Sequence, residues 1–247
     1  MVSGIVSDTL RAGWNGFLEL LYPSQCEGCG TWGEPPLCDT CIEGLDGFET
    51  DVCFVCPTAR GNAGCDACAA AEREWGGWAF DRASATFAYT GTLRHLVHVF
   101  KYRGVSTLGP LLGALMTQAI LDAGKDFPWD VVLPVPGEPG RTRQRGYNPA
   151  RLLARPIAEE MACRILTEDT VRRTRRSRSQ MGLSAEQRRC AGERFGFIVR
   201  DPTEVAGKAV LVVDDVFTTG STVQALATVL KGAGAKTVGV LCLAAGR

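Results

Sequence analysis

Short apolar runs alternate with helix-like patterns over the last two thirds of the chain. The runs that we expect to be strands are residues 83–89, 130–136, 208–216 and 237–244. Between them, apolar positions recur every three to four residues, which is typical of helices. The helices that we expect are residues 92–101, 108–121, 149–162 and 219–232. Buried strands separated by helices predict an α/β domain, residues 80–247, whose parallel sheet has helices on both faces.

The pattern before residue 80 is different. Residues 1–24 predict an amphipathic helix, with Leu10, Trp14, Phe17 and Leu21 at helical spacing and a proline near its end. We expect this helix to pack on the body of the protein. A membrane-surface role is the alternative, although the polar face of the helix is not basic. Residues 25–79, rich in glycine, proline and cysteine, form the third expected part.

Eight of the eleven cysteines form four C-x2-C pairs in this middle part. They are Cys26/Cys29, Cys38/Cys41, Cys53/Cys56 and Cys65/Cys68. Two such pairs complete a tetrahedral shell of four thiolates, which favours Zn²⁺. The sequence therefore predicts two structural zinc sites, with disulfides or an iron–sulfur cluster as alternatives. Sequential pairing is the simpler arrangement, and interleaved pairing is also open.

Charge is unevenly distributed although the net charge is zero. Residues 26–81 carry a net charge of −9, and residues 137–194 carry +7, with fourteen arginines. The acidic cysteine-rich part is unlike a DNA-binding finger, whereas the basic segment suits an anionic ligand. We find neither a signal peptide nor an apolar run long enough to insert into a membrane, so we expect a cytoplasmic protein.

The stretch 210–222, VLVVDDVFTTGST, carries the most chemical information. A buried strand brings Asp214 and Asp215 to the carboxyl edge of the sheet, where ligands bind in such folds. The following loop, 218–222, opens a helix and offers backbone N–H groups and hydroxyls to a phosphate. The carboxylates suit ribose hydroxyls or a metal ion. The sequence has neither of the glycine-rich motifs of P-loop and dinucleotide-binding proteins.

This stretch resembles the 5-phosphoribosyl-1-pyrophosphate (PRPP) signature of type I phosphoribosyltransferases, and nearly the whole chain resembles the ComF family. In that family a cysteine-rich zinc module precedes such a domain, and members are associated with competence and DNA uptake. Residues 100–104, 134–148 and 175–184 match further family elements, whereas Cys190 stands where members often have Asn. The resemblance implies a parallel phosphoribosyltransferase-like sheet flanked by helices, behind a small zinc-ribbon-like module.

The resemblance also implies roles for individual residues. We expect Asp214, Asp215 and Arg175 to act in catalysis, with Mg²⁺ accompanying PRPP, and the loop 173–183 to close over the ligand. The residues expected to bind PRPP are Thr218, Thr219, Gly220, Ser221, Thr222, Lys101, Arg143 and Arg145. Lys101 at a helix end has a simpler alternative role, which is to satisfy carbonyl groups. Asn148, directly before Pro149, is expected to cap a helix.

Three functions fit these features. The first is a PRPP-dependent transferase whose acceptor the sequence does not name. The second is a catalytically silent PRPP-binding protein that handles single-stranded DNA or partner proteins during DNA uptake. The basic segment supports both, because pyrophosphate and a nucleic-acid backbone are both anionic. The third is a zinc-dependent scaffold with a relic site, which the intact acids and phosphate loop disfavour.

Overall fold

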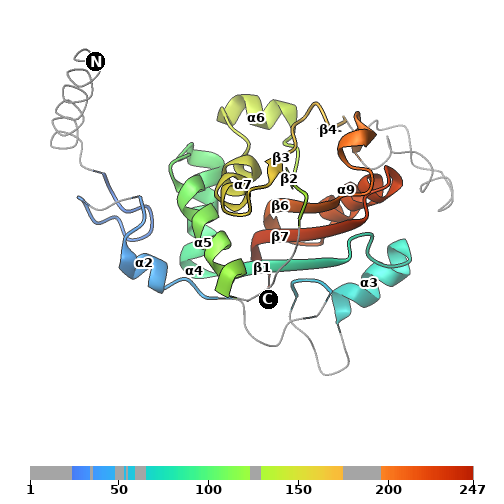
Figure 1. Ribbon diagram of the computed structural model, residues 1–247. Helices are drawn as coiled ribbons and strands as arrows, with labels where there is room; N and C mark the ends of the chain where they lie inside the picture. The colour runs from blue at the N-terminus through green and yellow to red at the C-terminus, as the bar shows by residue number, and fades with distance from the viewer. Residues whose placement is uncertain are drawn as a thin grey trace, which may run out of the picture. The chain divides into compact units, whose positions relative to one another are not determined.

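The computed structural model of the chain describes residues 24–33, 36–47, 53, 55–58, 65–122, 129–174 and 196–246 (Figure 1). The expected helix before residue 24, most of the expected loop 173–183, and Arg175 and Cys190 therefore lie outside the described residues. The chain forms two compact units, one within residues 1–45 and the other within residues 46–247. The three-part division expected from the sequence, 1–24, 25–79 and 80–247, stays a prediction.

Five parallel strands in the order β1-β7-β6-β2-β3 form the sheet of the larger unit. Their bounds are β1 Arg82–Ala88, β2 Val131–Pro134, β3 Arg164–Ile165, β6 Ala209–Phe217 and β7 Thr237–Ala245. Residues 238–245 of β7 are all buried, as expected for a strand with helices on both faces. The parallel sheet predicted from the apolar runs is therefore confirmed.

Helices cover the two faces of this sheet (Figure 1). They include α4 Gly91–His98, α5 Leu108–Asp122, α7 Pro149–Glu160 and α9 Ser221–Gly232. Helices α5 and α7 pack together, and α7 also contacts β2 and β6. Val210 and Val212 of β6 belong to the same core cluster as Leu226 of α9. Because side chains alternate along a strand, Leu211, between these valines, faces the α7 side.

Short elements complete the described structure. They are α2 Asp39–Glu43, α3 Asp66–Trp75, the π-helix η1 Val99–Arg103, α6 Pro139–Arg145, the hairpin β4 Val171–Arg173 with β5 Phe197–Val199, and the 3₁₀ helix η3 Pro202–Glu204. The sequence analysis missed most of them. Strands of two or three residues are too short for a periodic signal, and α6 has no buried residue to give one. No described helix has the length and apolar character needed to cross a bilayer.

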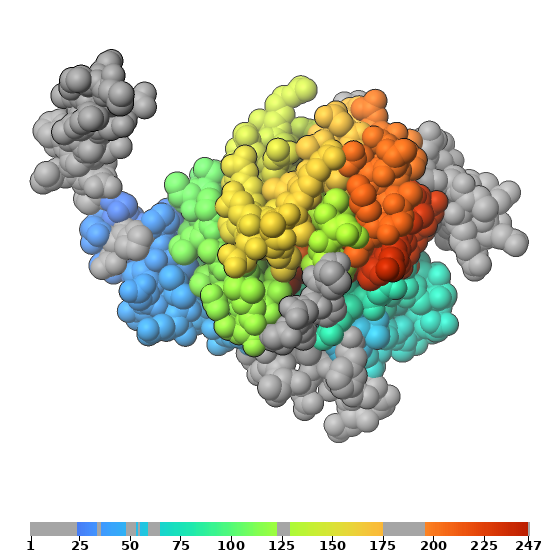
Figure 2. All heavy atoms as spheres, in the orientation of Figure 1, coloured from blue at the N-terminus to red at the C-terminus, as the bar shows by residue number. Residues whose placement is uncertain are grey.

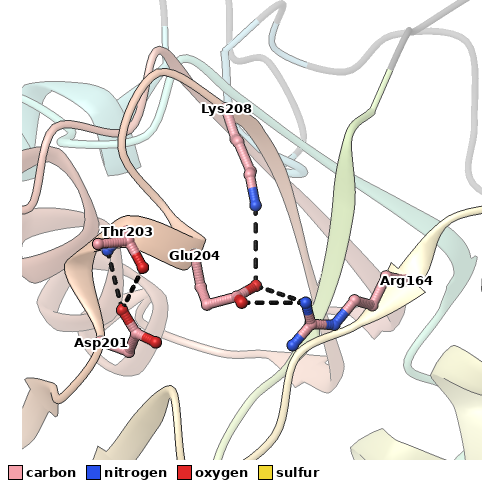
Figure 3. Close-up of polar contacts among 5 residues, drawn as sticks. All are labelled: Arg164, Asp201, Thr203, Glu204 and Lys208. Carbon is pink, nitrogen blue, oxygen red and sulfur yellow. Dashed lines mark hydrogen bonds and ion pairs between the residues drawn. The ribbon is translucent and has the colours of Figure 1, made fainter.

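Ion pairs of Glu204 tie together the end of the sheet where the strands begin (Figure 3). The Glu204 carboxylate lies 2.8 Å from Arg164, which starts β3, and 3.7 Å from Lys208, which precedes β6. Asp201 caps η3 by accepting a hydrogen bond from the Thr203 N–H at 3.0 Å. These contacts lie at the opposite end of β6 from Asp214 and Asp215, so they support the fold without lining the candidate site.

Candidate active site

The two carboxylates lie where the sequence analysis placed them, near the carboxyl end of β6. The Asp215 N–H donates a hydrogen bond to Asp214 Oδ1 at 2.9 Å. Burial, and then the negative charge of Asp215, raises the pKa of Asp214 to about 7. This carboxyl therefore changes charge near neutral pH, and a nearby cation or a hydroxyl donor would favour its charged form.

Lys101 is the cation that faces this pair. Its Nζ lies 2.7 Å from Asp215 Oδ1, and both side chains are mostly buried. The expected helix 92–101 changes at Val99 into the π-helix η1, which holds Phe100 fully buried and leaves Tyr102 64% exposed. Lys101, between them, reaches the end of β6. The ion pair with Asp215 was not foreseen, because nothing in the local sequence indicates this long-range contact.

The last residue of α6 and the turn that follows it contact the backbone of η1. The Tyr147 hydroxyl donates to the Phe100 carbonyl, and Arg145 Nε donates to the Lys101 carbonyl. The rings of Tyr147 and Phe100 are stacked, with centroids 5.6 Å apart. These contacts fix the position of the π-helix and therefore of the Lys101 side chain.

Asn148 holds the loop that follows β2. Its side chain accepts a hydrogen bond from the Ala150 N–H at 3.1 Å, which confirms the predicted helix cap. Its Nδ2 donates to the Val135 carbonyl at 3.0 Å. One side chain thus joins the start of α7 to the loop after β2, which lies within the family element 134–148.

A cavity of about 310 Å³ joins these parts. The expected site residues that line it are Lys101, Arg145, Asp214, Asp215, Thr218 and Thr222. Arg141 and Arg173 line it too, although they were not assigned as binding residues. Arg143, which was assigned, is exposed on α6 and does not line it. Residues 141 and 145 lie four apart and share a helix face, whereas residue 143 points elsewhere. Figure 2 shows α6, in yellow-green, projecting at the top of the view.

The loop 218–222, called the phosphate loop because it is expected to bind a phosphate, borders this cavity. It also borders a hollow of about 20 Å³ that Gly220 and Ser221 line. Gly220 has a φ of +74°, and a Cβ there would lie 2.6 Å from the Trp78 ring. Only glycine fits both the left-handed conformation and this close contact. Thr219, which is exposed, donates to Ser221 Oγ at 3.1 Å. The two ends of the loop, Thr218 and Thr222, therefore share a cavity with the basic side chains of Lys101, Arg141 and Arg145.

The cysteines form two groups of four. In each group the Sγ atoms all lie within 4.8 Å of one another, and Cys26, Cys29, Cys38 and Cys41 form one group and Cys53, Cys56, Cys65 and Cys68 the other. Several Sγ pairs are 3.4–3.7 Å apart. Tetrahedral zinc with Zn–S bonds of about 2.3 Å needs sulfurs about 3.8 Å apart, so both groups fit zinc. The grouping matches sequential pairing, and the described cysteines are all free thiols.

Local hydrogen bonds stabilise the thiolate of one buried or half-buried cysteine in each group. Burial acts to raise the pKa of Cys26, but the N–H groups of Cys38, Cys29 and Gly28 lower it to about 6. The pKa of Cys65 is likewise lowered to about 6 against the effect of burial, chiefly by the Thr58 hydroxyl and the backbone of Cys68. Metal ions bind the thiolate form, so these donors favour metal binding at neutral pH.

Comparison with known proteins gives consistent results. Residues 144–247 match the family model of the phosphoribosyl transferase domain. DNA utilization protein YhgH of Escherichia coli O6:H1 is 31% identical over 236 residues, which cover 91% of this chain and 98% of that protein. The Salmonella typhimurium protein of the same name is 32% identical over the same shares.

Two further similarities cover less of the chain. Competence protein F of Haemophilus influenzae is 28% identical over 183 residues, 73% of this chain and 77% of that protein. Among solved structures, the glutamine PRPP amidotransferase from B. subtilis, complexed with ADP and GMP, matches 56% of this chain and 26% of its own, with 23% identity and a TM-score of 0.42.

Proposed function

Because the chain belongs to the ComF family and carries a phosphoribosyl transferase domain, we propose that it binds PRPP and transfers the phosphoribosyl group to an acceptor. The observation that carries this proposal is the single cavity shared by the phosphate loop, the two carboxylates of β6 and the basic side chains. We also place the protein in the cytoplasm, because free thiols that bind zinc need a reducing compartment.

Different residues of the cavity bind different parts of PRPP. The loop Thr218–Thr222 holds the 5′-phosphate through its N–H groups, its hydroxyls and the start of α9. Asp214 and Asp215 accept hydrogen bonds from the ribose hydroxyls. Arg141 and Arg145, which line the cavity, meet the pyrophosphate. Arg143 is exposed, so we assign it a weaker part through its positive charge alone.

The reaction breaks the bond between ribose C1 and a pyrophosphate oxygen, and the acceptor takes C1. Positive charge develops on the ribose and negative charge on the leaving pyrophosphate. Lys101 and the arginines stabilise the leaving group, and Lys101 exchanges Asp215 for a phosphate oxygen when PRPP binds. The carboxylate oxygens of this cavity and the phosphate oxygens of bound PRPP would suit Mg²⁺, which would neutralise pyrophosphate charge. Arg173 lines the cavity, and we propose that the segment after it, with Arg175, covers the ligand.

Calorimetry with PRPP and Mg²⁺ tests the binding. The wild type should bind, and Asp215→Asn should lose about tenfold or more in affinity, because a carboxylate that accepts ribose hydrogen bonds is replaced by an amide. Glu204→Gln, at the other end of the sheet, should bind like the wild type. Release of pyrophosphate in the presence of candidate nucleophiles tests the transfer. A wild-type protein that does not bind PRPP would contradict the proposal.

A second candidate function is the handling of single-stranded DNA by a catalytically silent PRPP-binding protein. A neighbouring cavity of about 540 Å³ favours it, because the exposed Tyr102 lines that cavity and none of the described residues that line it is acidic. The other lining residues are Lys101, Arg103, Gly104, Arg141, Gln144 and Arg145. Basic side chains beside an exposed ring suit a nucleic-acid backbone and a stacked base. Two relatives also bear the name DNA utilization protein.

Binding of a labelled single-stranded oligonucleotide at several salt concentrations separates the two functions. The second predicts an affinity that falls steeply with salt and weakens in Tyr102→Ala and in Arg175→Ala/Arg176→Ala, without pyrophosphate release by any variant. Binding that is absent at low salt, or unchanged in both variants, would exclude this function.

A further inference from the structure

The second cysteine group is built into the larger unit. Cys56 is fully buried and belongs to the core cluster that also contains Phe80 and Phe217. The Ala83 N–H, at the start of β1, donates to the Val55 carbonyl at 2.7 Å. Cys65 is the N-cap residue of α3 and Cys68 lies in its first turn. The metal ligands of this group therefore share their packing with the sheet that carries the site.

Helix α3 leads from these ligands to the phosphate loop. It ends at Gly76 in a left-handed conformation, with Gly77 and Trp78 directly after it. Gln224 of α9 is only 7% exposed, and its side chain binds the segment 77–79 that follows α3. Its Oε1 accepts from the Ala79 N–H at 2.7 Å, and its Nε2 donates to the Gly77 carbonyl at 3.1 Å. A buried glutamine with both ends of its amide bonded fixes the two segments relative to each other.

Trp78, between the two residues that Gln224 holds, covers the phosphate loop. Its ring lies 2.6 Å from the position that a Gly220 Cβ would take. It stacks on Phe80 with centroids 4.8 Å apart, and it meets the Phe217 ring edge-on at 6.0 Å. The left-handed conformation of Gly220 is therefore enclosed by an aromatic cluster whose position depends on the end of α3.

The other edge of the Trp78 ring faces the cysteine group. Its indole N–H is buried and has no well-formed hydrogen bond among the described residues. The Cys68 thiol is the sulfur that lies beside this N–H. A zinc-bound thiolate is a better acceptor than a thiol, so metal binding would supply a partner for this N–H.

We propose that zinc in the Cys53/Cys56/Cys65/Cys68 group, acting through Trp78 and Gln224, holds the phosphate loop in the conformation that binds PRPP. Trp78 and Gln224 are positioning residues, because they contact the loop and its helix but do not line the cavity. The other cysteine group belongs to a separate compact unit, so its zinc has no such effect. The inference rests on the proposed binding of PRPP.

Two matched pairs of cysteine substitutions test the inference. Cys65→Ser/Cys68→Ser and Cys29→Ser/Cys41→Ser should each retain one zinc per chain by metal analysis. The first variant should lose about tenfold or more in PRPP affinity, and the second should stay within about twofold of the wild type. Hydrogen exchange of the backbone in residues 217–224 should become faster in the first variant only. Equal PRPP affinity and equal exchange in the two variants would overturn the inference.

A substitution that leaves all cysteines in place covers the case in which the first variant does not fold. Gln224→Leu removes both hydrogen bonds to the segment 77–79, and Gln118→Leu, at an exposed position of α5, is its control. Gln224→Leu should keep two zinc ions and show weaker PRPP binding and faster exchange at 217–224. Wild-type affinity and exchange in Gln224→Leu would overturn the inference. Failure of the wild type to bind PRPP would instead overturn the proposed function, and the exchange experiment would still test the link between zinc and loop.

Discussion

Asp214 shows how the site concentrates charge at single residues. Its carboxyl lies beside that of Asp215 in poorly solvated surroundings, which raises its pKa to about 7. Lys101 and Arg173 act in the opposite direction, and the ion pair of Lys101 with Asp215 is 2.7 Å long. The two carboxylates repel each other, and one close cation offsets this repulsion only in part. A bound ligand with hydroxyl groups or a metal ion would reduce the remaining electrostatic cost to the folded protein.

This cost predicts that Asp214→Asn stabilises the protein above neutral pH. A carboxyl whose pKa is raised in the folded protein binds a proton more tightly there than in the unfolded chain. Its contribution to stability is therefore lost as pH rises from about 4 to about 7. Asparagine does not titrate, so at pH 8 the variant should be more stable by about 1–3 kcal/mol, with a smaller difference at pH 5. Urea unfolding of both proteins at the two pH values measures this, and an equal difference at both would contradict the assigned pKa.

At the scale of secondary structure, three elements that are distant in sequence form the cavity. The π-helix η1 carries Lys101, the α6–α7 turn holds η1 through Tyr147 and Arg145, and β6 supplies the carboxylates. Asn148 then joins α7 to the loop after β2. Each element by itself presents ordinary polar residues, and the cavity exists because the parallel sheet brings the ends of β2 and β6 together.

Two substitutions of Asn148 separate its roles as helix cap and as loop anchor. Asn148→Ala loses both and should cost about 1–2 kcal/mol in the free energy of unfolding. Asn148→Asp keeps the acceptor that caps α7 but cannot donate to the Val135 carbonyl. It should recover part of the stability and still bind PRPP more weakly than the wild type. Denaturant unfolding and calorimetry measure the two effects, and full recovery of both by aspartate would show that the bond to Val135 has no role.

The whole molecule divides its two cysteine groups between its two compact units. The described residues between 24 and 47 include few buried side chains, so among them the first group has only a small apolar core for support. The second group lies on the core of the larger unit, where Cys56 is fully buried. Zinc bound at the two groups would therefore differ in importance: we expect it to be the main source of stability in the first group and an addition to a large core in the second.

This difference predicts how the metal is held. Purified reduced protein should contain close to two zinc ions per chain by elemental analysis, because each group offers four thiols in tetrahedral spacing. Treatment with a chelator should remove them in two phases, and Cys29→Ser/Cys41→Ser should lack the phase of the first group. A metal content near zero in freshly reduced protein would contradict both sites.

The amino-acid sequence by itself determined the parallel sheet, the two groups of four cysteines and the loop that opens the helix after β6. These features are local: a buried strand, a C-x2-C turn and a loop opening a helix each occupy a few consecutive residues, and their chemistry follows from residue type and spacing. Only the tertiary structure decided that Lys101 pairs with Asp215, that Arg141 lines the cavity while Arg143 does not, and that Trp78 covers Gly220. These contacts join residues distant along the chain, or depend on the direction of a short helix without a hydrophobic face. They depend on how the elements pack, which no local pattern encodes.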